Sequence, residues 1–101
     1  MALFAVHCRD AAGMEQARQD LRDAHLAHVE RNIGRYAVAG PLRDASGAIT
    51  GSLLVIEAED SAAAQAFLAA DPYSEGGIWT RVEIDAFSAV AGSWVGGVAW
   101  K

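Results

Sequence analysis

The stretch IWTRVEIDAF, residues 78–87, alternates between two kinds of side chain along its whole length. Because successive side chains of a β-strand point to opposite faces, this period of two predicts a strand with one apolar and one largely polar face. The predicted apolar face carries Ile78, Thr80, Val82, Ile84 and Ala86. The other face carries Trp79, Arg81, Glu83, Asp85 and Phe87. This is the last strand that the sequence predicts.

Three further strands and a long helix are predicted upstream. The run that begins at Leu3 is apolar on both faces apart from His7, which is typical of a central strand covered by helices on one side. Pro41 cannot donate to a sheet ladder, and turn residues follow it, so we expect a hairpin loop to begin there. The predicted strands are residues 3–8, 35–40 and 49–58, and the predicted helix runs from about Gly13 to Ile33.

A second helix is predicted between the last two strands. Asp60 or Ser61 can cap this helix by accepting bonds from its first free backbone N–H groups, and Pro72 marks its end. The order βαββαβ is that of an α+β, ferredoxin-like unit, in which two helices pack on one face of a four-stranded antiparallel sheet. An exposed apolar sheet face is uncommon on a stable monomer, so we expect a homodimer or a higher homo-oligomer.

The chain has 101 residues, enough for one hydrophobic core and too few for two domains. We expect a domain at residues 1–88, followed by an apolar tail at 89–101 that holds two of the three tryptophans. Aromatic side chains are enriched at protein interfaces, which favours docking of the tail on a neighbouring subunit. Folding of the tail over its own domain, or its disorder, is the alternative.

Composition argues against several kinds of partner. The net charge is −5, and the eight Lys and Arg residues are scattered, which disfavours nucleic acid. No apolar run approaches the ~20 residues that cross a bilayer, so we expect no membrane partner. The single Cys8 cannot form an intrachain disulfide, and the N-terminal residues lack the pattern of an export signal. The expected location is the cytoplasm.

His25 is the candidate for proton transfer. The helical period places this imidazole in a stripe with apolar residues, and the stripe becomes more polar toward its end. Asp71, where the second helix closes, is a carboxylate that could orient a neutral imidazole. The hypothesis is a catalytic His25/Asp71 dyad that lines a small cleft. A hydrogen-bonded core histidine, and an aspartate that only caps a turn, are the alternatives.

Three other residues are candidates for substrate binding. Arg22 could bind a carboxylate or phenolate, Ser52 could offer a hydroxyl, and Tyr73 could form an aromatic wall. Each also has an ordinary structural explanation as a solvated, strand or core residue. His7, Cys8, His25 and His28 do not have the spacing of a metal site, and we expect neither a metal nor a cofactor.

Five short segments, in this order, resemble the YCII-related (YciI-like) family. The segments are Arg22–Leu26, Ala39–Leu42, Gly51–Leu53, Ala70–Tyr73 and Gly76–Trp79. The resemblance covers most of residues 1–88 and implies a dimeric α+β barrel, in which two ferredoxin-like units join their sheets. It also implies an active site around a histidine and an aspartate, here His25 and Asp71. One branch of the family is implicated in dehydrochlorination of a chlorinated hydroxyquinol. The Trp-containing tail and His28 depart from the family pattern.

Together these features predict a cofactor-independent enzyme of the lyase or isomerase type that acts on a small cyclic or aromatic molecule. His25 would move a proton, Asp71 would orient His25, and Arg22 or Ser52 would hold an anionic oxygen of the substrate. The alternative is a non-catalytic module of the same fold that binds a small ligand or serves assembly.

Overall fold

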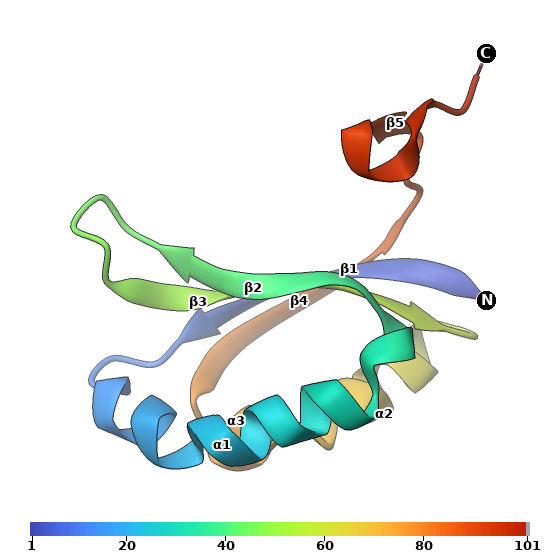
Figure 1. The fold of residues 1–101 in the computed structure, drawn as a ribbon. Coiled ribbons are helices and arrows are strands. Elements are labelled where there is room, and N and C mark those ends of the chain that lie inside the picture. The colour runs from blue at the N-terminus through green and yellow to red at the C-terminus, as the bar shows by residue number, and fades with distance from the viewer. Residues whose placement is uncertain (101) are drawn as a thin grey trace.

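The computed structural model describes residues 1–100, and its centre is a four-stranded antiparallel sheet with strand order β2-β3-β1-β4 (Figure 1). This order and the βαββαβ sequence of elements confirm the α+β, ferredoxin-like fold. β1 is an inner strand, as its two apolar faces predict. The strands are β1 Ala2–Asp10, β2 Tyr36–Arg43, β3 Ile49–Ala58 and β4 Trp79–Phe87.

The helices lie together on one face of this sheet (Figure 1). They are α1 Glu15–Arg31, α2 Ser61–Ala69 and α3 Pro72–Glu75, and a short 3₁₀ turn, η1 Ile33–Arg35, leads into β2. The side chain of Asp60 caps α2 by accepting from the Ala63 N–H, which confirms one of the two predicted caps. No helix among residues 1–100 is long and apolar enough to cross a membrane.

Two predicted boundaries were wrong, both at prolines. Pro41 does not open the loop, because β2 continues to Arg43 with Pro41 paired to Ser52. β2 is an edge strand, where a residue without an N–H can face away from the ladder. Pro72 does not end α2 but begins α3, at the first helical position, where a missing N–H costs nothing. The helix before it ends at Ala69.

The hydrophobic core lies between the helices and one face of the sheet. Alternate residues of each inner strand enter it, so Phe4, Val6 and Cys8 of β1 are buried while their neighbours are more exposed. Leu54, Ile56 and Ala58 of β3 do the same. On β4 the predicted apolar face does turn toward the helices, since Ile84 pairs with Val6. The prediction was wrong for Trp79, which is buried like Ile78 because the pairing of β1 with β4 shifts register at that end of the strand. Val82 on that face stays 40% exposed because β4 is the other edge of the sheet.

The opposite face of the sheet is open (Figure 1). Residues directly paired across antiparallel strands share a face. The pairs Ala5 with Val55 and His7 with Leu53 therefore place these side chains on the open face, beside Phe87, which pairs with Leu3. Leu53 is 41% exposed and Phe87 44% exposed. The charged residues of β4, such as Glu83 and Asp85, lie along one side of this apolar area.

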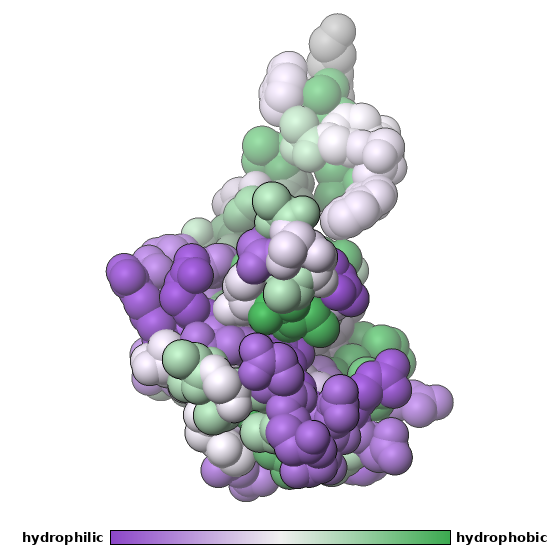
Figure 2. Space-filling view, turned by 90° about the vertical axis from the view of Figure 1, so that its left-hand side faces the viewer, coloured by the Kyte–Doolittle hydropathy of each residue, from purple (hydrophilic) through white to green (hydrophobic). Residues whose placement is uncertain are grey.

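The tail after β4 rises on the side of the open face (Figures 1 and 2). It forms a small hairpin of β5 Ala91–Gly92 and β6 Gly97–Val98, with a 3₁₀ turn between them. Gly96 takes φ +81°, a left-handed conformation that glycine adopts without a steric cost. Trp94 and Trp100 remain 85% and 67% exposed, so neither side chain packs into the core of its own domain.

Candidate functional site

A cavity of about 540 Å³ lies between α1 and the half of the sheet formed by β2 and β3. The end of β1 and the start of α3 complete its walls. The polar groups that line it come from five different elements, which is typical of a ligand site held by a rigid scaffold. They include Asp10, Arg18, Arg22, His25, Ser52 and Tyr73. Leu26, Val29, Pro41 and Leu54 contribute apolar walls.

The structure brings His25 and Asp71 into direct contact. His25 Nδ1 lies 2.8 Å from Oδ1 and 3.0 Å from Oδ2 of Asp71. A carboxylate oxygen accepts, so Nδ1 is the ring nitrogen that donates, and this leaves Nε2 for exchange with a ligand. Asp71 is 2% exposed and lies behind the imidazole, while His25 lines the cavity.

Asp71 is positioned by the start of α3. It is the N-cap residue of this helix, and its Oδ1 accepts from the Tyr73 N–H at 2.8 Å. Pro72 follows at the first helical position and fixes the backbone there. The Ile78 N–H donates to the Tyr73 carbonyl and ties the end of this turn to the start of β4. The carboxylate therefore sits on a rigid turn between two elements of the core.

Tyr73 packs against the face of the His25 imidazole. Its ring is stacked on His25 with centroids 3.8 Å apart and planes at 5°. Trp79 meets Tyr73 edge-on at 6.0 Å, and both are buried. The ring of His25 is thus fixed both by a hydrogen bond in its plane and by a contact on its face.

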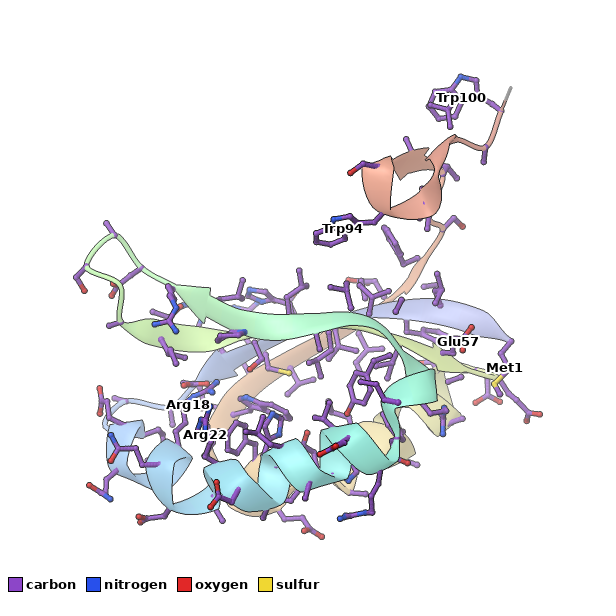
Figure 3. All side chains as sticks on the ribbon, viewed as in Figure 1. Met1, Arg18, Arg22, Glu57, Trp94 and Trp100 are labelled. Atoms are coloured by element: carbon purple, nitrogen blue, oxygen red, sulfur yellow. The ribbon has the colours of Figure 1, made fainter. Side chains whose placement is uncertain are left out.

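Ser52 and Arg22 also border the cavity, in different ways. Ser52 is 5% exposed, and its Oγ accepts from Arg18 Nη2 at 3.1 Å. Arg22 is exposed and points from α1 toward the sheet (Figure 3). All the predicted substrate-binding residues therefore lie around one cavity, together with His25.

Arg18 and Asp10 were not predicted as site residues from the sequence. Arg18 Nε lies 2.6 Å from Asp10 Oδ2, and Arg18 Nη2 lies 3.0 Å from Asp10 Oδ1, a bidentate pair. The two side chains are only 12% and 8% exposed. Arg18 stands two helical turns before His25 on the same stripe of α1, and this spacing was the available signal.

Gly51 makes this arrangement possible. A Cβ on residue 51 would lie 2.0 Å from the carbonyl oxygen of Cys8, so only glycine fits between β1 and β3 at this point. The carbonyl of Gly51 accepts from Arg18 Nη2 at 3.3 Å. The close approach of the two strands thereby brings the backbone of β3 and Ser52 within reach of the guanidinium.

Two other chemically interesting residues lie outside the cavity wall. His28 is buried on α1 against Phe67, and its Nε2 has no hydrogen-bond partner among residues 1–100. Cys8 is fully buried. Burial, followed by the charges of Asp71 and Asp10, raises the pKa of the Cys8 thiol to about 12. A neutral, inaccessible thiol cannot serve as a nucleophile. Within residues 1–100, no cluster of three His, Cys, Asp or Glu side chains could hold a metal.

Comparisons with known proteins give matches over most of the chain. The family model of the YCII-related domain matches residues 2–88. Protein YciI of Escherichia coli O6:H1 is 34% identical over 96 residues, which cover 87% of this chain and 98% of that protein. Protein YciI of Shigella flexneri matches equally well.

A solved structure matches as well. It is 5-chloro-2-hydroxyhydroquinone dehydrochlorinase (TftG) from Burkholderia phenoliruptrix, in complex with 2,5-dihydroxybenzoquinone. The TM-score is 0.80 at 29% identity, and the match covers 90% of this chain and 96% of TftG.

Proposed function

This chain belongs to the YCII-related family, and on that premise we propose that it is a cofactor-independent lyase or isomerase with a small cyclic or aromatic substrate. The observation that carries the proposal is the His25 imidazole in the cavity wall, with Asp71 at 2.8 Å behind it and Tyr73 stacked on its face. The similarity to TftG, a dehydrochlorinase, supports an elimination reaction.

In the proposed reaction, Nε2 of His25 removes a proton from a hydroxyl or carbon of the bound ring. The electron pair left behind forms a new double bond, and the leaving group departs with its own bonding pair. A chlorinated substrate would lose one proton and one chloride, so the step needs no redox partner. Asp71 keeps the proton on Nδ1 and stabilises the imidazolium that forms. Arg22, Ser52 and Tyr73 would hold the substrate ring and its oxygens.

The test is turnover of chlorinated hydroquinones, followed as chloride release by the purified protein. We expect His25→Asn to lower kcat by about 10²–10⁴-fold, the usual contribution of a positioned acid or base. Asp71→Asn should also lower kcat, because an amide can donate to Nδ1 and so favour the wrong tautomer. Glu30→Gln is the control, since Glu30 is exposed on α1, outside the cavity wall and away from the open face of the sheet.

Circular dichroism would show whether each variant is folded. Unchanged kcat in a folded His25→Asn variant would remove His25 from the mechanism. Binding of hydroquinones without any turnover in the wild-type protein would favour the other candidate, a ligand-binding module.

We also propose that the chain is a homodimer whose subunits join through the open sheet faces, with the tail contacting the partner subunit. The accessible surface of 6362 Å² exceeds the ~5,500 Å² expected for a monomer of this mass. The excess is close to the roughly 800 Å² that each partner buries in an interface of standard size. Apolar groups on the open face and tail, including Leu53, Phe87 and Trp94, supply part of this surface.

A further inference from the structure

The guanidinium of Arg18 is fixed along one edge only. Its Nε and Nη2 both donate to the Asp10 carboxylate, and Nη2 also approaches Ser52 Oγ and the Gly51 carbonyl. The third guanidinium nitrogen, Nη1, donates no hydrogen bond within residues 1–100. Because Arg18 is largely buried and borders the cavity, Nη1 is the donor that a ligand can use.

Ser52 complements this donor. Its Oγ accepts from Arg18 Nη2, so its own O–H is directed elsewhere and can donate to a second acceptor. Both side chains line the cavity. A guanidinium N–H and a hydroxyl held next to each other form a cradle for a negatively charged oxygen, since charge-assisted bonds are stronger than neutral ones.

Arg18 keeps its positive charge in this position. Burial disfavours the charged form, but the hydrogen bond and ion pair with Asp10, together with the nearby Tyr73 side chain, outweigh burial and raise the pKa of Arg18 above its ordinary value. The cavity wall also holds Arg22 and Arg43, against the acidic residues Asp10 and Glu15. The lining thus carries an excess of positive charge in a chain whose net charge is −5.

The ring of Tyr73 connects this cradle to His25. The Arg18 Cζ lies 4.9 Å from the centre of the Tyr73 ring, which is also stacked on His25. Arg18 and His25 are seven residues apart on α1, a rise of about 10 Å along the helix. A ligand that reaches both residues needs an anionic oxygen at one end and a removable proton toward the other.

We propose that Arg18 and Ser52 form the oxyanion subsite of the cavity, with Asp10 as the residue that positions Arg18. The ligand class is a small ring that carries an ionised hydroxyl or a carboxylate. Arg22, the arginine singled out in the sequence, is exposed and without an anchoring carboxylate among residues 1–100, so it is secondary. This assignment rests on the proposed function, because it takes the same cavity as the ligand site.

The experiment measures binding of two quinones by isothermal titration calorimetry at neutral pH. The first is 2,5-dihydroxybenzoquinone, whose hydroxyls are acidic and ionised under these conditions. The second is 2,5-dimethoxybenzoquinone, which has the same ring but cannot ionise. We expect the wild-type protein to prefer the ionised quinone, and Arg18→Met to weaken its binding by about 10- to 100-fold while changing that of the neutral quinone little.

Arg18→Met leaves the Asp10 carboxylate buried without a partner, so that variant can lose stability. The double variant Arg18→Met/Asp10→Asn removes both charges and should keep the fold while losing the preference. Arg31→Met is the control for net charge, because Arg31 is exposed at the end of α1 and outside the cavity wall.

Each result bears on the assignment. Loss of the preference in the double variant, with Arg31→Met unchanged, supports the subsite. A folded double variant that keeps the wild-type preference would overturn it. Equal wild-type affinity for both quinones would overturn it too, while leaving the cavity as a ligand site. If the wild-type protein bound neither quinone, both the subsite and the proposed function would be contradicted.

Discussion

At the scale of single residues, Asp71 serves the backbone and a side chain at once. Its Oδ1 accepts from the Tyr73 N–H that begins α3 and also from His25 Nδ1. Capping a helix and orienting an imidazole looked like competing explanations in the sequence, but one carboxylate oxygen has enough lone pairs for both. Fixing the cap therefore also fixes the position of His25 relative to Tyr73.

Cys8 gives a prediction for the pH dependence of stability. The ordinary pKa of a thiol is 9.0, and in the folded protein the pKa of Cys8 is about 12. Above the ordinary pKa the unfolded chain loses the thiol proton while the folded chain keeps it. The proton number is then higher in the folded state, so the free energy of unfolding falls as pH rises. That contribution is complete below pH 9 and is lost between pH 9 and pH 12.

The measurement is urea unfolding of wild type and Cys8→Ala at about pH 8 and about pH 10. We expect the wild-type protein to lose stability over this interval. Cys8→Ala should start lower, because it removes a buried side chain, and should change less with pH. The pKa of Tyr36 is also raised to about 12, mainly by burial, and it adds a similar decline above pH 10. An equally steep decline in both proteins between the two pH values would contradict the assignment to Cys8.

His25 and Asp71 could be predicted from the sequence, whereas the role of Arg18 could not. His25 could be found because a titratable ring on an apolar stripe is unusual, and Asp71 because it lies in a recognisable turn. Arg18 lies on the same stripe but looks like an ordinary helix flank. Its importance depends on Asp10, on Ser52 and on the close approach of Gly51 to Cys8. These contacts join three parts of the chain, β1, α1 and β3, and no local pattern contains them.

At the scale of elements, the turn from β3 into α2 depends on one side chain. Asp60 accepts from the Ala63 N–H at 2.8 Å and begins α2, which supplies the buried Ala64 and Leu68. We expect Asp60→Ala to lower the free energy of unfolding by about 1 kcal/mol, the usual cost of removing an N-cap. Urea unfolding at neutral pH measures this difference.

Glu59→Ala is the matched control, because Glu59 is the preceding exposed acid and does not cap α2. It removes the same charge and should change stability by less than about 0.5 kcal/mol. Equal effects of the two substitutions would mean that charge, and not the cap, accounts for the loss.

The two boundaries predicted at prolines were wrong for a reason that lies in the strands and helices around them. A proline restricts its own strand or helix locally, but its effect depends on which edge or end it occupies. Pro41 is tolerated because β2 is an edge strand, and the strand order follows from the whole sheet. Periodicity over longer segments was more informative, since the alternation of β4 and the length of α1 predicted both elements to within two residues.

At the scale of the whole molecule, the open face of the sheet leads to a prediction about oligomeric state. The radius of gyration is 14.2 Å, above the ~13 Å of a compact chain of this length, as expected for a domain with a projecting tail. One chain has a mass of 10.6 kDa. We expect light scattering at micromolar concentration to give twice this mass. Leu53 lies in the middle of the open face. Leu53→Glu should lower the measured mass toward that of a monomer, because dimerisation would bury an unpaired charge.

The matched control is Leu26→Glu, because Leu26 is equally exposed, at 43%, but lies on α1 across the sheet from the open face. It should leave the mass unchanged.

A second variant, Trp94→Ser, tests the tail, since Trp94 extends from the tail above the sheet while Trp100 points away from it (Figure 3). If the tail contacts the partner, Trp94→Ser raises the dissociation constant of the dimer without unfolding the domain. A dimer that forms equally well in Leu53→Glu would show that the subunits join elsewhere. The 41% exposure of Leu53 would then have to be explained as a tolerated apolar surface of a single subunit.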